Sequence, residues 1–98
     1  MSPSEDAGEL AVRDNETRRR YEVAIGDGTA ILTYVRRPGT IQLVHTEVPP
    51  ALRGKGLANV LAKAALEAAR DAGVRVIATC PYVQAFLKKH PEYQSLTG

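Results

Sequence analysis

The sequence predicts an α+β (α/β) fold in which a mostly antiparallel sheet is followed by one parallel strand pair and two helices. The first observation is a series of three strand-like runs between residues 20 and 48, rich in alternating or β-branched apolar residues and separated by glycine or proline turns. The second is a helical pattern over residues 55–72, followed directly by a short apolar run at 74–79. A strand–helix–strand order implies a parallel, right-handed crossover.

The N-terminal end of the chain has the least regular pattern. Residues 1–8 are mostly small, polar or acidic, with too few apolar groups to pack, so we expect a flexible tail. Residues 9–98 are then expected to form one domain. Within it, residues 10–12 are predicted to form a short strand, and the polar residues 14–16 a turn.

Three stronger strands follow. In residues 20–25 apolar and polar side chains alternate, which is typical of a half-buried strand, and Gly-Asp-Gly at 26–28 predicts a hairpin turn. Residues 29–36 are rich in strand-forming side chains and end at a Pro-Gly turn. The third strand is predicted over 40–48, where two consecutive prolines stop it because neither can donate to a ladder.

The two helices complete the predicted order. The first, over residues 55–72, ends at Gly73, a plausible left-handed cap. Its apolar stripe is predicted to consist of Leu57, Val60, Leu61, Ala64, Ala65 and Ala68. After the strand at 74–79, Cys80-Pro81 ends the extended run, and a second helix is predicted over 82–89.

Composition limits the function classes. A chain of 98 residues with net charge +2 is one small domain, too weakly basic to indicate a nucleic-acid-binding protein. The run Arg18–Arg20 has no interleaved aromatic residues and is interpreted as the solvated start of a strand. No apolar run is long enough to span a membrane, and the single cysteine suits a reducing compartment. We therefore expect a cytoplasmic monomer or weak dimer.

The turn before the first helix is the clearest functional signal. It reads Arg53-Gly54-Lys55-Gly56-Leu57-Ala58, two glycines and two basic residues at a helix N-terminus. Such a terminus has free N–H groups and partial positive charge, and glycine lets a phosphate approach. The pattern lacks the hydroxyl residue of a nucleoside-triphosphate loop, and Asn59 stands where a dinucleotide loop has its third glycine.

The turn does fit [QR]-x-x-G-x-[GA] and resembles the pyrophosphate loop of the GCN5-related N-acetyltransferases, which bind acetyl-CoA. The segments H-T-E-V-P-P-x-L-R-G-K-G-L-A, T-C-P-Y-V and K-K-H-P-E-Y extend the resemblance from His45 to Tyr93, toward a very small branch of that superfamily. It implies the acyl-CoA N-acyltransferase fold, with the cofactor between two splayed strands and no metal. The arm would follow Thr46 to Val48, the amides of Gly54 to Ala58 would hold the phosphates, and Tyr82 could bond the arm.

The chain also departs from the larger family members. Their N-x-x-A-x-x-[LF]-Y pattern ends in a tyrosine that protonates the departing thiolate, and Leu87 stands there in this chain. There is no room for the helices that form a substrate wall, so an open site is expected. Two functions follow from the resemblance. One is acetyl transfer from acetyl-CoA to an amine of a small molecule or protein; the other is a CoA-binding or interaction module with little catalysis.

Three residues are candidates for the chemistry. His45 and Glu47 lie two apart on one predicted strand, so they share a face and could accept the acceptor's proton. Their alternatives are an ordinary strand histidine and a solvated strand-end carboxylate. Cys80 precedes the second helix at the border of the cofactor gap, and the resemblance implies an acetyl acceptor or a group handling the thiolate proton. The alternative is a small buried hydrophobe.

Overall fold

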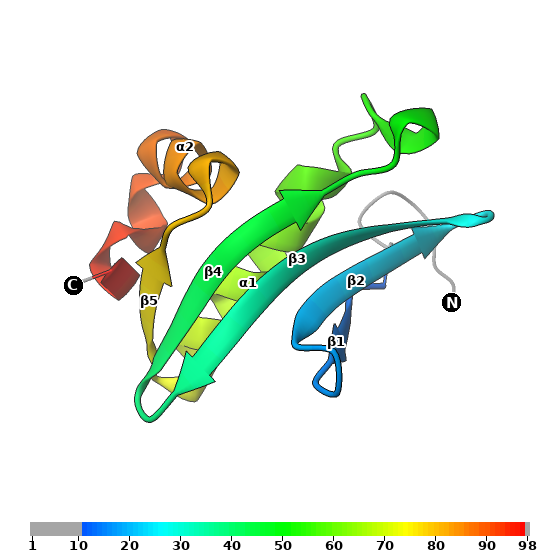
Figure 1. Ribbon diagram of the computed structural model, residues 1–98. Helices are drawn as coiled ribbons and strands as arrows, with labels where there is room; N and C mark the ends of the chain where they lie inside the picture. The colour runs from blue at the N-terminus through cyan, green and yellow to red at the C-terminus, as the bar shows by residue number, and fades with distance from the viewer. Residues whose placement is uncertain (1–10, 98) are drawn as a thin grey trace, which may run out of the picture.

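The computed structural model describes residues 11–97 and contains one five-stranded sheet in the order β1-β2-β3-β4-β5 (Figure 1). All neighbouring strands are antiparallel except β4 and β5, which are parallel. The elements in chain order are β1 (Arg13–Asn15), β2 (Arg20–Ile25), β3 (Gly28–Arg37), β4 (Thr40–Glu47), η3 (Pro50–Leu52), α1 (Leu57–Ala72), β5 (Arg75–Ala78), α2 (Pro81–Lys89) and η4 (Pro91–Thr97). The predicted fold class is confirmed, including the parallel pair around a crossover helix.

The core lies on one side of this sheet. Helix α1 packs behind β3 and β4 in Figure 1, and we call the face that it covers the inner face and the opposite one the outer face. Inner-face side chains of the central strands are buried against α1: Leu32, Tyr34, Ile41 and Leu43. In the part of the chain that the structure describes, no helix lies over the outer face of β2 and β3. One covered face and one open face explain the alternation in these strands.

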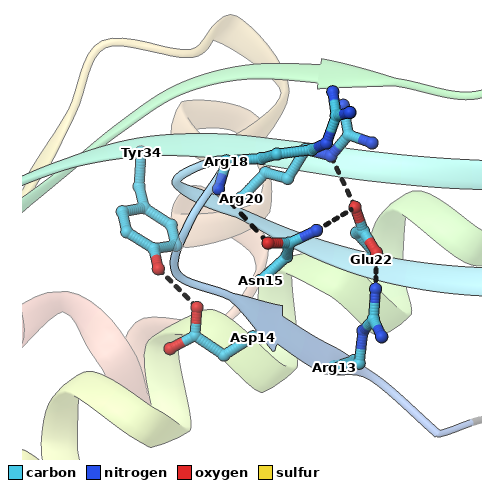
Figure 2. Close-up of polar contacts among 7 residues, drawn as sticks. All are labelled: Arg13, Asp14, Asn15, Arg18, Arg20, Glu22 and Tyr34. Carbon is cyan, nitrogen blue, oxygen red and sulfur yellow. Dashed lines mark hydrogen bonds and ion pairs between the residues drawn. The ribbon is translucent and has the colours of Figure 1, made fainter.

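The strand at the N-terminal edge corrects one prediction. Ala11 and Val12 are not in a strand, and Leu10 and the predicted tail lie outside the described residues. Strand β1 instead contains Asp14 and Asn15, two of the three residues predicted to form a turn, whereas the third, Glu16, is in a turn. The turn follows at residues 16–19. Polar residues form this strand because their side chains bond to the sheet: the Tyr34 hydroxyl donates to Asp14, and Arg13 pairs with Glu22 at 2.8 Å (Figure 2).

Glu22 is the centre of that polar cluster. Its side chain is on the outer face of β2, and the residue is only 8 % exposed. Its carboxylate accepts hydrogen bonds from Arg20 (2.6 Å), Arg13 (2.8 Å) and Asn15 (3.0 Å), as Figure 2 shows. Hydrogen bonds from Arg20 and then Arg13 lower the pKa of Glu22 to about 2. Buried charges are tolerated when paired in this way, so the cluster fastens the short edge strand β1 to β2.

The remaining strands and the two α-helices match the predictions to within two residues, whereas η3 and η4 were not predicted. Helix α1 differs from the prediction in its buried face. It begins at Leu57 rather than at residue 55, because Gly56 is its N-cap with a left-handed backbone (φ 75°), and Gly73 ends it with φ 72°. Leu57, Leu61 and Ala65 are buried as predicted. Val60, Ala64 and Ala68 are only partly buried, and the rest of the buried face is formed by Ala62, Leu66 and Ala69.

Candidate functional site: a fork between β4 and β5

The parallel strands β4 and β5 separate partway along β4. Their pairing ends at Leu43 and Ala78, and β4 continues to Glu47 without a β5 partner. At the branch point the carbonyl oxygen of Leu43 accepts hydrogen bonds from the N–H groups of both Thr79 (3.1 Å) and Cys80 (3.0 Å). Beyond it the chain turns into α2, which begins at Pro81. The result is a fork, seen between β4 and α2 in Figure 1, in which no strand among residues 11–97 pairs with the β4 edge beyond Leu43 on this side.

A β-bulge in β4 decides which side chains face each side of the fork. Tyr34 of β3 pairs with Leu43, but Thr33 pairs with His45, so Val44 is an extra residue in β4. Paired residues point to the same face, and an extra residue reverses the alternation that follows. The bulge therefore places His45 and Glu47 on the outer face and Thr46, opposite the buried Leu32, on the inner face.

The inner side of the fork contains the only cysteine of the chain. Cys80 is 2 % exposed and belongs to the hydrophobic core, and its Sγ lies 3.3 Å from the Thr46 hydroxyl oxygen. Its carbonyl accepts the N–H of Gln84 at 3.0 Å, which begins the bonding of α2. Cys80 thus lies at the helix N-terminus where the sequence predicted it, but it is buried against Thr46.

The loop after η3 forms an open cradle at the N-terminus of α1. Gly54 and Gly56 have φ values of 84° and 75°, and a Cβ added to either would meet nothing within 4 Å. No side chain caps the helix, and its first turn has no acidic residue. The first intrahelical bond runs from Val60 N–H to Gly56 O at 3.1 Å. The preceding N–H groups, those of residues 57–59, are left for an anion or water, so the loop fits a phosphate group.

Two adjoining hollows connect this cradle to the fork. The loop hollow, about 250 Å³, is lined by Val48, Leu52, Arg53, Gly54, Gly56, Leu57, Ala58 and Tyr82. The strand hollow, about 390 Å³, is lined by His45, Thr46, Glu47, Val48, Arg53, Ala58 and Tyr82. Four residues border both hollows, and one of them, Arg53, is held in place because its Nε donates to the Val48 carbonyl at 3.2 Å. The combined site runs from the helix N-terminus to the end of β4.

Tyr82 lies where the two hollows meet. It is 37 % exposed, and its hydroxyl donates to the Oδ1 atom of Asn59 in the first turn of α1. Burial raises the pKa of Tyr82 above its ordinary value. The bond joins the first turns of α1 and α2 across the site. The sequence analysis did not identify Asn59 as a site residue, although its place three residues after Gly56 puts it in the first helical turn.

Most of the predicted site residues are brought together by this arrangement. Two do not line either hollow: Lys55, which is exposed beside the loop, and Cys80. Leu57 has its side chain in the core, so only its backbone is available to a ligand. Among residues 11–97 no cluster of His, Cys, Asp or Glu is placed to hold a metal ion. No helix in that range is long and apolar enough to cross a membrane.

Comparisons with known proteins show the family and the fold. The family model described as GCN5-related N-acetyl-transferase matches residues 20–96. Protein NATD1 of Mus musculus is 35 % identical over 98 residues, which cover 97 % of this chain and 89 % of that protein. Protein NATD1 of Homo sapiens is 34 % identical over 90 residues, covering 89 % and 80 %.

The solved structures include one with the same architecture. The NMR structure of a Staphylococcus aureus protein described as GCN5-like superposes with a TM-score of 0.66 at 26 % identity, covering 89 % of this chain and 86 % of that one. The family match, the NATD1 relatives and the solved structure all include the segment that forms the fork and the loop. The chain belongs to the GCN5-related N-acetyltransferase family.

Proposed function

We propose that this protein binds acetyl-CoA in the two adjoining hollows and transfers its acetyl group to an amine. The pyrophosphate would occupy the loop hollow, held by the backbone N–H groups from Gly54 to Ala58, and the pantetheine arm would lie along Thr46 to Val48. The observation that carries the proposal is the continuity of the site, in which an uncapped helix N-terminus opens directly into an unpaired strand edge.

The loop supplies what a pyrophosphate needs. Free N–H groups at the start of a helix point toward the ligand, and the helix dipole places about half a positive charge there. Arg53 borders both hollows and adds a full positive charge. The left-handed glycines matter because the space beside them is open, and a side chain at either position would extend into the place proposed for the phosphate oxygens.

The unpaired edge of β4 offers backbone hydrogen-bonding groups to the pantetheine arm. The pantetheine arm is an extended chain with two amide groups, and it can take the hydrogen bonds that β5 makes to β4 before the fork. The residues at this end of β4 are exposed or half-buried, so the N–H and C=O groups of the unpaired edge are accessible to such a ligand. The arm would bring the thioester toward the branch point, near Thr46 and Cys80.

The proposed reaction needs one group that takes the proton of the amine and one that handles the acetyl group or the leaving thiolate. Because of the bulge, the candidates for these two roles lie on opposite sides of β4. Attack by a neutral amine requires a group to take its proton, and we assign this role to His45 or Glu47, which lie on the outer face of β4. The acceptor would therefore approach from the open face of the sheet. Cys80 on the inner side is proposed either to receive the acetyl group transiently or to handle the thiolate proton, with Thr46 fixing its sulfur. The acceptor amine belongs to a small molecule or a protein.

A second function, CoA binding with little or no catalysis, rests on two observations. Leu87 occupies the position of the tyrosine that protonates the thiolate in larger members, and it is buried. Cys80, the other candidate for that proton, is also buried and lines neither hollow. Release of free thiol from acetyl-CoA in the presence of a panel of amines distinguishes the two functions.

The substitution Gly56→Asp tests the binding site. It places a carboxylate where the phosphate would lie, so we expect acetyl-CoA affinity, measured by titration calorimetry, to fall at least about tenfold, or about 1.4 kcal/mol. The matched control is Gly39→Asp, because Gly39 in the β3–β4 turn has the same φ of 75° and equally open surroundings. Both variants carry the same backbone strain and added charge. Equal affinity in the two variants would contradict the placement of the phosphates.

A further inference from the structure

We propose that Gly28, at the start of β3, is a positioning residue for the loop that precedes α1. This inference rests on the proposed function, because it states what holds the loop hollow in the shape that would accept a pyrophosphate. It follows from one close contact, in which the side chain of Leu52 lies directly against the bare Cα of Gly28.

Gly28 differs from every other glycine that the structure describes. The other five have positive φ angles, and a Cβ added to any of them would meet nothing within 4 Å: Gly26, Gly39, Gly54, Gly56 and Gly73. Gly28 has no positive φ, so its backbone would accept an ordinary residue. A Cβ there would lie 2.7 Å from the Leu52 Cδ1 atom and 3.3 Å from its Cγ atom. The close approach of another side chain, and not the turn, therefore explains the glycine at this position.

Leu52 is the anchor of the short helix η3. It is the only residue of η3 that is buried, with 7 % of its surface exposed. Helix η3 packs against β3, and in Figure 1 the short coil after β4 lies on the same side of the molecule as the β2–β3 hairpin. Leu52 also lines the loop hollow. One side chain thus touches both the hairpin and the proposed cofactor site.

The segment that contains Leu52 is stiff, so a displacement of this side chain is passed on to the loop. Pro49 and Pro50 have φ angles fixed by their rings. The N–H of Leu52 donates to the Pro49 carbonyl at 2.9 Å, and the N–H of Arg53 donates to the Pro50 carbonyl at 3.3 Å. The Arg53 side chain closes the segment on β4, because its Nε donates to the Val48 carbonyl at 3.2 Å. These bonds join η3 and the start of the glycine loop into one unit.

A methyl group at position 28 would therefore narrow or shift the loop hollow. Leu52 is packed in the core, and the open space beside it is the hollow that it lines. A rotated Leu52 side chain would enter that hollow, whereas a side chain that kept its rotamer would carry η3 away from β3. Both responses change the place proposed for the pyrophosphate. Gly28 itself lines neither hollow, so it acts on this place only through Leu52.

The substitution Gly28→Ala tests this role through binding and through the loop itself. Extra atoms in a packed core shift side chains and backbone, so we expect the affinity for acetyl-CoA, measured by titration calorimetry, to fall at least about fivefold. Amide NMR spectra of the free variant should show changed shifts from Leu52 to Ala58. The matched control is Gly26→Ala in the same hairpin, where a Cβ meets nothing within 4 Å. It strains a left-handed backbone and costs stability, but its affinity should stay within about twofold of wild type and its loop shifts should not change.

The substitution Leu52→Val identifies the contact. Valine lacks the Cδ1 methyl nearest to position 28, so adding Gly28→Ala to Leu52→Val should lower the affinity less than about twofold relative to Leu52→Val alone. An equal cost in both backgrounds would mean that the effect does not pass through Leu52 and would overturn the proposal, as would wild-type affinity in Gly28→Ala. If Gly28→Ala alone does not fold, a folded double variant that binds as Leu52→Val does supports the proposal, and an unfolded one contradicts it.

The spectra of the free protein separate this inference from the proposed function. If the wild type does not bind acetyl-CoA at millimolar concentration, the proposed function fails. Loop shifts that occur in Gly28→Ala and not in Gly26→Ala would in that case still support Gly28 as the residue that positions the loop. Shifts confined to the β2–β3 hairpin in both variants would contradict it.

Discussion

At the scale of single residues, Glu22 shows how a charged side chain stabilises the edge of this sheet. Its carboxylate is nearly buried and accepts three hydrogen bonds, two of them from arginines. Two of the donors, on Arg13 and Asn15, belong to β1, a strand of only three residues. Backbone pairing of so short a strand is weak, so the side chains of this cluster supply much of what holds it.

The same cluster predicts a dependence of stability on pH. Glu22 has a pKa of about 2 in the folded protein, below its ordinary value of 4.5. A depressed carboxyl pKa stabilises the fold above pH 4.5, and this contribution is lost as the pH falls toward 2. We expect a loss of about 2 kcal/mol in the free energy of unfolding across this range, measured by urea denaturation. Glu22→Gln should be less stable at pH 7 and should lose most of this dependence; a wild-type pH profile in the variant would contradict the account.

The site residues illustrate which single positions a sequence can reveal. The place of Arg53, Gly54 and Gly56 at the start of α1 was predictable because glycines mark the end of a loop before a helix; their role in binding an anion stays a prediction. The pairing of Tyr82 with Asn59 was not predictable, since it joins two helices whose relative placement depends on the whole core. The burial of Cys80 was also undetermined, because a lone cysteine is equally at home in a core or a site.

At the scale of elements, β4 is the strand that shapes the site. Period-two alternation correctly placed His45 and Glu47 on one face. It did not reveal the bulge at Val44, which puts these residues on the outer face and Thr46 beside Cys80. The sequence from Val44 to Glu47 fits a regular strand equally well. The bulge is recognised only from the pairing of β4 with β3, in which Val44 has no partner.

For helix α1, too, the sequence predicts the element but not the face that it buries. Both its ends were predictable to within two residues from the glycines at either end. The direction of its buried face was not, because alanines and other apolar residues occupy most sides of the helix. Packing against β2, β3 and η4 selects the side with Ala62 and Leu66 over the side with Val60 and Ala64.

Truncation of one residue on each side tests that orientation. Leu66 is 0 % exposed, so Leu66→Ala should lower the free energy of unfolding by about 2–5 kcal/mol through lost burial and the cavity left behind. Val60 is only partly buried, and we expect Val60→Ala to cost less than about 1 kcal/mol. Chemical denaturation of both variants measures the difference. Equal losses, or a larger loss for Val60→Ala, would mean that α1 presents a different face to the sheet.

At the scale of the whole molecule, the fold has one covered and one open sheet face. The inner face holds the core, and the fork opens at the end of the parallel pair, where β4 continues alone. The loop hollow lies at the N-terminus of α1, and the strand hollow lies along the end of β4, where His45, Thr46 and Glu47 all border it. The proposed function has the cofactor and the acceptor meet at this end of β4, which is bordered by both hollows.

The measurement that tests the central claim most directly is an amide NMR titration of the protein with acetyl-CoA. The account predicts saturable shifts centred on Val48, the loop from Gly54 to Ala58, and Cys80, with small changes in the distant polar cluster around Glu22. Shifts confined to other surfaces, or none at millimolar acetyl-CoA, would contradict the assignment of the fork and its loop as the cofactor site.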